Sequence, residues 1–215
     1  MPNDLAKFEQ HIEVLEKPCL AVDLLALNTP LSKQQIKLVM QKGAVWLSKG
    51  EKTQRLRRAK KTVKIGEIIH IYYDPTVLSQ TPPSPTLISD EGFYSIWNKP
   101  CGLYSQGSKW GDHCTISRWA EQKLIPERNS FIVHRLDKAA NGLILMAHEK
   151  NAAAKLSKLF QDRLIIKRYQ VWVQGHFNEK HLTQIPFRVN SDIDERSAIS
   201  HFTQIEYNES QNRSL

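Results

Sequence analysis

The stretch FIVHRLDKAANGLILMAHEK, residues 131–150, most constrains how this 215-residue chain can fold. Its apolar runs Phe-Ile-Val and Leu-Ile-Leu-Met flank a cluster that contains His134, Arg135 and Asp137. Short apolar runs bounded by turn residues indicate buried strands. Charged groups beside buried strands are costly unless they are paired or used. The stretch therefore predicts a strand, a charged turn and a second strand, with charges that serve either structure or chemistry.

Positive charge is concentrated in one block of the sequence. Between residues 31 and 65 there are 11 Lys and Arg residues against one acid, Glu51, whereas the rest of the chain has 19 against 21. The net charge of +8 therefore comes entirely from this block. Such a block is typical of a surface that binds a polyanion such as nucleic acid, and the alternative is a solvated charged face.

Cysteine usage and hydropathy argue against several other classes. Cys19, Cys101 and Cys114 form neither a disulfide framework nor a metal-type pair, which favours reduced thiols and predicts no metal site. The N-terminal residues lack a signal-peptide core, and no stretch approaches the roughly 18 apolar residues that a membrane helix needs. We expect a cytoplasmic protein without membrane association.

Hydrophobic periodicity predicts an α+β chain in several parts. The apolar residues between Leu5 and Leu15 recur at helical spacing, which predicts one amphipathic helix there. A stretch rich in Pro, Ser and Thr indicates an extended linker before the second domain. The expected parts are an N-terminal helical extension (1–30), a basic module (31–74), the linker (75–86) and a second domain (87–215).

In the basic module, Ser32 is a candidate cap for a helix that buries Ile36, Val39 and Met40 and stops at Gly43. Strands are expected at 44–47 and 65–73, on either side of a basic loop. This order resembles the small alpha-L RNA-binding domain of ribosomal proteins and RNA-modifying enzymes. Seven of its cations are candidates to neutralise RNA phosphates in a salt-sensitive, sequence-independent contact. They are Lys33, Lys37, Arg55, Arg57, Arg58, Lys60 and Lys61.

The second domain alternates strand and helix signals. Strands are predicted at 93–97, on both sides of the charged turn, at 165–175 and at 200–207, with a turn at 98–102 and a helix over 149–163. These elements predict a mixed α+β domain with a largely antiparallel sheet.

Three motifs occur in this domain: NKPxG (98–102), HRLD (134–137) and KRYxVxVxG (167–175). In this order and at this separation they resemble the catalytic domain of the RluA-type pseudouridine synthases. The resemblance implies an isomerase, an intramolecular transferase that converts uridine in RNA to pseudouridine. The base leaves the ribose, turns and is rejoined through a carbon atom, and the reaction needs no cofactor.

The resemblance also implies residue roles. Asp137 is the nucleophile or the base at the ribose, where an ionised carboxylate faces developing positive charge. Arg135 enters the stack that the extruded uridine leaves, and Tyr169 lies against the uracil and helps remove the proton from its carbon. The alternatives are an ion pair between Asp137 and Arg135, a phosphate contact for Arg135 and core packing for Tyr169. His134 and Lys99 are expected to support the neighbouring turns.

The sequence departs from the family pattern at two places. Ala140-Asn141 stands where a Thr-Ser pair is usual, so hydroxyls that tie down the turn are missing. Residues 208–215 predict a turn and the start of a return strand, and the family pattern implies further sheet and a basic partner for Asp137 beyond them. We therefore expect a catalytic domain that is incomplete at its C-terminus and, by itself, poorly stable or inactive.

Three interpretations follow. The first is an RNA pseudouridine synthase with an N-terminal RNA-binding domain and no obligatory protein partner. By analogy with other appended RNA-binding modules, ribosomal RNA is favoured over transfer RNA as its substrate. The second is a catalytically impaired RNA-binding remnant of the same family. The third is an unrelated α+β domain that binds a protein.

Overall fold

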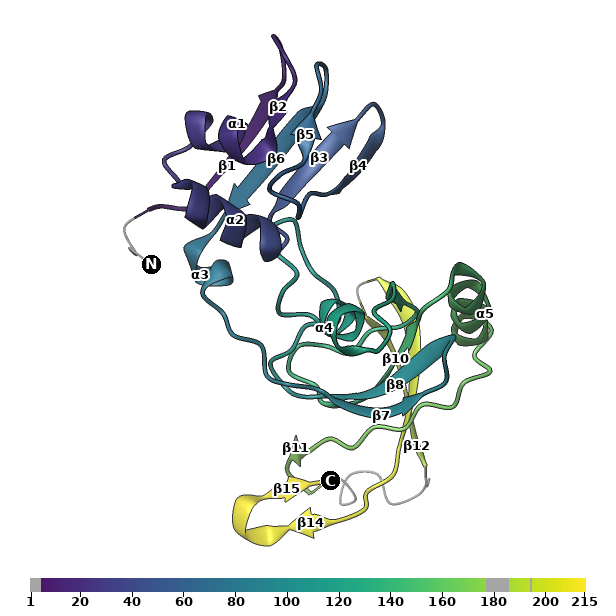
Figure 1. Ribbon diagram of the computed structural model, residues 1–215. Helices are drawn as coiled ribbons and strands as arrows, with labels where there is room; N and C mark the ends of the chain where they lie inside the picture. Colours follow the sequence, from purple (N-terminus) through teal and green to yellow (C-terminus); the bar gives the residue numbers. More distant parts are fainter. Residues whose placement is uncertain (1–4, 177–185, 194) are drawn as a thin grey trace. The chain divides into compact units, whose positions relative to one another are not determined.

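The structure, a computed structural model, describes residues 5–176, 186–193 and 195–215 (Figure 1). The chain forms two compact units, Met1–Leu164 and Ile165–Leu215. Every pair of named strands in the described residues is antiparallel, which confirms the mixed, largely antiparallel α+β fold. Within these ranges, no helix combines the length and apolar character needed to cross a membrane.

The first unit begins with a four-stranded sheet in the order β1-β6-β3-β4. Its strands are β1 (Phe8–Glu13), β3 (Val45–Lys49), β4 (Lys52–Arg55) and β6 (Ile68–Tyr73). The helices α1 (Ala21–Asn28) and α2 (Lys33–Gln41) pack on one face, and β2 (Cys19–Leu20) pairs with β5 (Thr62–Val63) (Figure 1). Leu25, Ile36 and Ile71 are fully buried in the core between helices and sheet.

The helix predicted between Leu5 and Leu15 is wrong. Phe8–Glu13 is a strand that pairs with β6, with Phe8 opposite Tyr73. Apolar residues at i and i+4 share a face in a strand as well as in a helix, so the spacing was ambiguous. Pairing with β6 decides the outcome, because an uncovered edge of β6 would leave backbone groups without partners.

The predicted helix of the basic module is confirmed in detail. The Ser32 side chain accepts from the N–H of Gln35, and the Gln35 side chain accepts from the N–H of Ser32. The helix ends before Gly43, whose φ of +79° suits a residue without a Cβ. Two nearby expectations need correction, because β4 lies in the predicted basic loop and α3 (Pro75–Leu78) lies in the predicted linker.

A second four-stranded sheet follows in the order β7-β8-β10-β9. Its strands are β7 (Thr86–Asp90), β8 (Tyr94–Lys99), β9 (Phe131–Ile132) and β10 (Gly142–Ala147). The helix α4 (Ile116–Lys123) packs on this sheet, with Ile116 and Ala120 against Trp97, Ile144 and Met146 (Figure 1). β9 and β10 confirm the strand, turn and strand predicted for residues 131–150. The helix α5 (Lys150–Gln161) confirms the helix predicted after them.

The second unit contains a β12–β13 hairpin and a small sheet in the order β11-β15-β14. Its elements are β11 (Val173–Gln174), β12 (Phe187–Ile193), β13 (Arg196–Phe202), β14 (Tyr207–Asn208), the 3-10 helix η2 (Glu209–Gln211) and β15 (Arg213–Ser214). The turn and return strand at the end of the chain are confirmed.

Two strand predictions in this unit are wrong in extent. Of the strand predicted over 165–175 only β11 forms, and β13 ends at Phe202 instead of reaching Tyr207. The alternating side chains of the first segment are largely exposed, with Ile166 at 84% and Tyr169 at 64%. Alternation predicts a strand only where one face is buried, and this segment buries neither face.

A buried chain of hydrogen bonds links β8, the residue that follows β10 and the segment before β9. Trp97 Nε1 donates to Ser95 Oγ (2.7 Å), Ser95 pairs with His148 Nε2 (2.8 Å), and His148 Nδ1 lies 2.8 Å from the carbonyl of Asn129. A carbonyl only accepts, so Nδ1 carries the proton and Nε2 accepts from the Ser95 hydroxyl. This arrangement fits a neutral imidazole, and burial lowers the pKa of His148 below its ordinary 6.5.

We predict that acidification weakens the fold through His148. Because its folded-state pKa is lowered, the unfolded chain binds more protons between that pKa and 6.5, so the free energy of unfolding falls as pH falls below 6.5. In His148→Gln this contribution is absent, and the fall between about pH 7 and pH 5 becomes smaller. Urea denaturation at several pH values measures it. An unchanged pH dependence in the variant contradicts the prediction.

Candidate active site

The charged cluster lies on the turn that joins β9 to β10. Leu136 is 8% exposed and belongs to the core beneath the second sheet. Its neighbours Arg135 and Asp137 are both exposed. The buried leucine thus anchors the turn, and the two charged side chains on either side of it remain accessible.

Side chains from neighbouring elements hold the first half of this turn. The N–H of Leu145 donates to His134 Nε2 (2.9 Å), and the His134 ring packs on Phe160 with centroids 4.4 Å apart. The buried Ser105 hydroxyl donates to the carbonyl of Leu136 (2.6 Å) and accepts from the N–H of the same residue (3.0 Å). The structural role expected for His134 is confirmed.

A buried ammonium holds the second half of the turn. Lys99, at the end of β8, is 0% exposed. Its Nζ donates to the carbonyls of Pro100 (3.2 Å), Leu103 (2.9 Å) and Ala140 (2.6 Å). Burial lowers the pKa of Lys99, and the nearby Cys101 and Asp137 act in the opposite direction. The expectation that Lys99 supports the neighbouring loop is therefore confirmed.

The turn is closed without the hydroxyls that Ala140-Asn141 lacks. The N–H of Ala140 donates to the carbonyl of Asp137 (3.1 Å), and its carbonyl accepts from Lys99. The N–H of Gly102 donates to the carbonyl of Lys138 (2.8 Å). Backbone bonds and one ammonium therefore hold the turn at Ala140.

Two of the alternatives left open by the sequence can be compared with this geometry. Among the residues that the structure describes, no ion pair joins Asp137 to Arg135. Tyr169, in the second unit, is 64% exposed, which argues against the alternative of core packing. Its role at the uracil stays a prediction. The described residues hold no group of three or more His, Cys, Asp or Glu suited to a metal ion.

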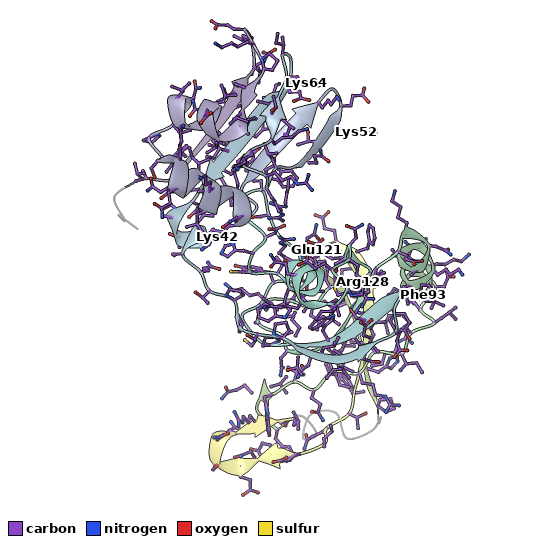
Figure 2. All side chains as sticks on the ribbon, in the orientation of Figure 1. Lys42, Lys52, Lys64, Phe93, Glu121 and Arg128 are labelled. Carbon is purple, nitrogen blue, oxygen red and sulfur yellow. The ribbon has the colours of Figure 1, made fainter. Side chains whose placement is uncertain are left out.

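The seven predicted RNA-binding cations fall into two groups. Five are exposed, namely Lys33, Lys37, Arg58, Lys60 and Lys61. Four of these five, all except Lys33, line a groove of about 610 Å³ together with Lys64, which is labelled in Figure 2. Lys33 instead forms an ion pair with Asp23 (2.7 Å). Arg55 and Arg57 differ, because both are largely buried against the carboxylate of Asp112.

Sequence reasoning missed Ser105 and Asp112. Neither lies in a motif or on a periodic face, and each acts through contacts with residues distant in the sequence. Only the proximity of Ser105 to the NKPxG motif hints at its importance. Long-range contacts of this kind leave no local pattern in the sequence.

Comparison with known proteins matches residues 93–215 to the family model described as RNA pseudouridylate synthase, which is more than half of the chain. The chain belongs to the RNA pseudouridylate synthase family. The resemblance to the RluA-type enzymes is confirmed as well, since curated relatives carry that name. The turn with Asp137 therefore lies within the part of the chain that matches the family model.

Relatives match over part of their length. A dual-specificity RNA pseudouridine synthase RluA of Vibrio vulnificus is 38% identical over 100 residues, which cover 46% of this chain and 39% of that protein. The enzyme of the same name from Escherichia coli K12 is 33% identical over 97 residues, covering 44% and 43%. A ribosomal large subunit pseudouridine synthase C of Rickettsia conorii is 33% identical over 85 residues, covering 39% and 27%.

The chain thus spans less than half the length of the curated relatives it matches. Among solved structures, human RNA pseudouridylate synthase domain containing 4 matches 60% of this chain and 56% of that chain. The sequence identity is 16% and the TM-score is 0.41, too low to add to the description of the fold.

We predict that Lys99→Met lowers the free energy of unfolding by about 1–3 kcal/mol, because carbonyls that now share a buried ammonium lose their donor. Urea denaturation measures the loss. Lys150→Met, which removes an exposed lysine from α5, is the matched control and should change stability by less than about 0.5 kcal/mol. Equal stability of the two variants would show that the ammonium is dispensable.

Proposed function

We propose that this chain is an RNA pseudouridine synthase, an isomerase that converts uridine in structured RNA to pseudouridine, with Asp137 as the nucleophile or base at the ribose. The observation that carries the proposal is an exposed carboxylate on a turn held by Lys99, Ser105 and His134, within the matched part of the family. A preorganised support for a reacting group is what an active site needs.

The chemistry explains why a carboxylate is required. The bond from N1 of uracil to C1′ of the ribose breaks, positive character develops at the sugar, and an ionised carboxylate on that face stabilises it. The base turns, a bond from C5 to C1′ forms, and the proton on C5 leaves while N1 regains one. The low exposure of Leu136 beneath Asp137 keeps the carboxylate at the surface, where RNA can reach it.

We propose that Arg135 and Tyr169 handle the base. A glycosidic bond inside folded RNA is reached by extruding the nucleotide. Arg135 is exposed next to Asp137, and its planar guanidinium is suited to stack where the base was. Tyr169 is 64% exposed, so its ring is available to lie against uracil and to assist removal of the proton from C5.

The N-terminal part supplies RNA affinity in this proposal. We assign the sheet with α1 and α2 to an alpha-L RNA-binding domain, whose groove of Lys37, Arg58, Lys60 and Lys61 contacts phosphates. Ribosomal RNA is the favoured substrate, since an appended module suits a large structured RNA, and the protein is expected in the cytoplasm. The name of the Rickettsia conorii relative agrees with that substrate.

We predict that this chain releases tritium from ribosomal RNA carrying uridine tritiated at carbon five. Asp137→Asn keeps the shape of the side chain but removes its charge, and release should fall at least about 1,000-fold. Asp162→Asn, an identical change at the exposed end of α5, should leave release unchanged. A gel-shift assay with the same RNA checks that Asp137→Asn still binds.

The other interpretations give different results in the same assay. No release from any of the chains, with salt-sensitive RNA binding intact, identifies a catalytically impaired RNA-binding remnant. Absence of both release and binding contradicts the proposed function. Unmodified transfer RNA, tested in parallel, separates the two candidate substrates.

We predict that the groove residues control how salt weakens RNA binding. The logarithm of the binding constant falls with the logarithm of salt concentration by about 0.7 to 0.9 per neutralised phosphate, so Lys60→Met with Lys61→Met should reduce the slope by about 1 to 2. Lys155→Met with Lys158→Met removes the same charge from exposed positions of α5 and should leave the slope unchanged. Equal slopes in the two double variants would rule out the groove as a site that contacts RNA phosphates.

A further inference from the structure

The segment 102–115, here called the bridge segment, contacts at one end the turn between β9 and β10 that carries Asp137, here called the catalytic turn. Ser105 makes two hydrogen bonds to Leu136, and the N–H of Gly102 donates to the carbonyl of Lys138. The Lys138 ammonium lies 4.6 Å from the centre of the Tyr104 ring. The start of the bridge segment is therefore tied to the catalytic turn by hydrogen bonds and a cation–π contact.

The other end of the bridge segment docks on the basic module through Asp112. Its carboxylate lies 3.0 Å from Arg55 Nε and also pairs with Arg57. Its N–H donates to the carbonyl of Lys42 (3.0 Å), the C-cap residue of α2 that Figure 2 labels. The three side chains of this ion pair are only 13–23% exposed, so salt screens them less than a surface pair.

Further contacts surround Asp112. Arg55 also donates to the carbonyl of Ser108 (2.8 Å), and Trp46 Nε1 donates to the carbonyl of Lys109 (3.1 Å). Lys109 pairs with Glu9 of β1 (2.7 Å). Trp110 packs edge-on against Tyr72 of β6, and the ammonium of Lys7 lies over its ring. The bridge segment thus meets β1, β3, β4 and β6.

The backbone on both sides makes room for the Asp112 carboxylate. Gly43 follows α2 with φ of +79°, and a Cβ there would collide with the Asp112 side chain. A Cβ at Gly107, within the bridge segment, would collide with Asp112 as well. Two close approaches to one side chain indicate a specific fit, beyond the attraction of opposite charges.

We propose that Asp112 is a positioning residue that fixes the basic module relative to the catalytic turn. Building on the proposed function, RNA held by the exposed cations then presents one uridine to Asp137, and Arg55 and Arg57 serve this docking instead of binding phosphate. The link runs from Arg55 and Arg57 through Asp112 and Ser105 to the turn, and it connects two parts far apart in the sequence.

The proposal predicts a loss confined to large substrates. In Asp112→Asn, kcat/KM on ribosomal RNA should fall about 10- to 100-fold, because small misplacement of a reacting group is costly. On a short hairpin that contains the modified uridine but is too small to reach the module, kcat/KM should stay unchanged. The Kd for ribosomal RNA should stay equal or become lower, since two arginines are released. Asp162→Asn is the matched control.

Arg57→Met tests the same contact from the opposite side. It should reproduce the loss on ribosomal RNA without changing the salt slope of binding, and the double variant with Asp112→Asn should be no worse than either single variant. A salt slope reduced by about 1 in Arg57→Met, with full turnover in Asp112→Asn, would instead make Arg57 a phosphate contact and overturn the proposal. Equal losses on the short hairpin and the large RNA would also overturn it.

A measurement that does not depend on activity separates this proposal from the proposed function. Spin labels at Glu51→Cys and Glu127→Cys, with the three native cysteines replaced, report the distance between module and second sheet. We expect one narrow distance distribution in the parent chain and in Asp162→Asn, and a broad one in Asp112→Asn. An unchanged distribution in Asp112→Asn refutes the docking role. If the distance distribution broadens in Asp112→Asn but the parent chain releases no tritium, the proposed function is refuted. Asp112 is then still the residue that fixes the basic module.

Discussion

A single ammonium at the end of β8 gathers three carbonyls that belong to two separate loops. Lys99 contacts Pro100 and Leu103 in the loop after β8 and Ala140 in the turn before the neighbouring strand β10, and it is 0% exposed. A buried charge is tolerated only where its hydrogen bonds are satisfied, and here each donor finds a carbonyl. The loop after β8 and the turn before β10 are thereby held together, and the position of Asp137 follows from this bond set.

The cations of the basic module serve two physical purposes. Arg58, Lys60 and Lys61 remain in water, where flexible charges attract a polyanion at a distance. Arg55 and Arg57 are drawn into a largely buried ion pair with Asp112, and both guanidinium groups contact its Oδ2 atom. A charged partner that is largely removed from water favours a fixed contact over a diffuse one. Sequence alone counts all five as equal, because charge patterning does not distinguish a solvated cation from a docked one.

Local patterns predicted an element correctly where several independent local features agreed. The helix that begins at Ser32 combines a cap, an apolar face and a glycine stop, and all three features appear as expected. Prediction failed at Phe8–Glu13, where helical and strand periods coincide and pairing with β6 decides. It failed again around Tyr169, where alternation is present but neither face is buried. In both places a long-range partner, or its absence, overrides the local signal.

The sequence by itself determined the strand, turn and strand at residues 131–150, the family, and the candidacy of Asp137 and Arg135, because motif and apolar pattern are local properties. The tertiary structure decided what holds that turn and where the basic module docks. Ser105 meets Leu136 across 31 positions and Arg57 meets Asp112 across 55. Contacts at such separations depend on how the sheets pack, and packing arises from the whole chain at once, so no window of sequence contains them.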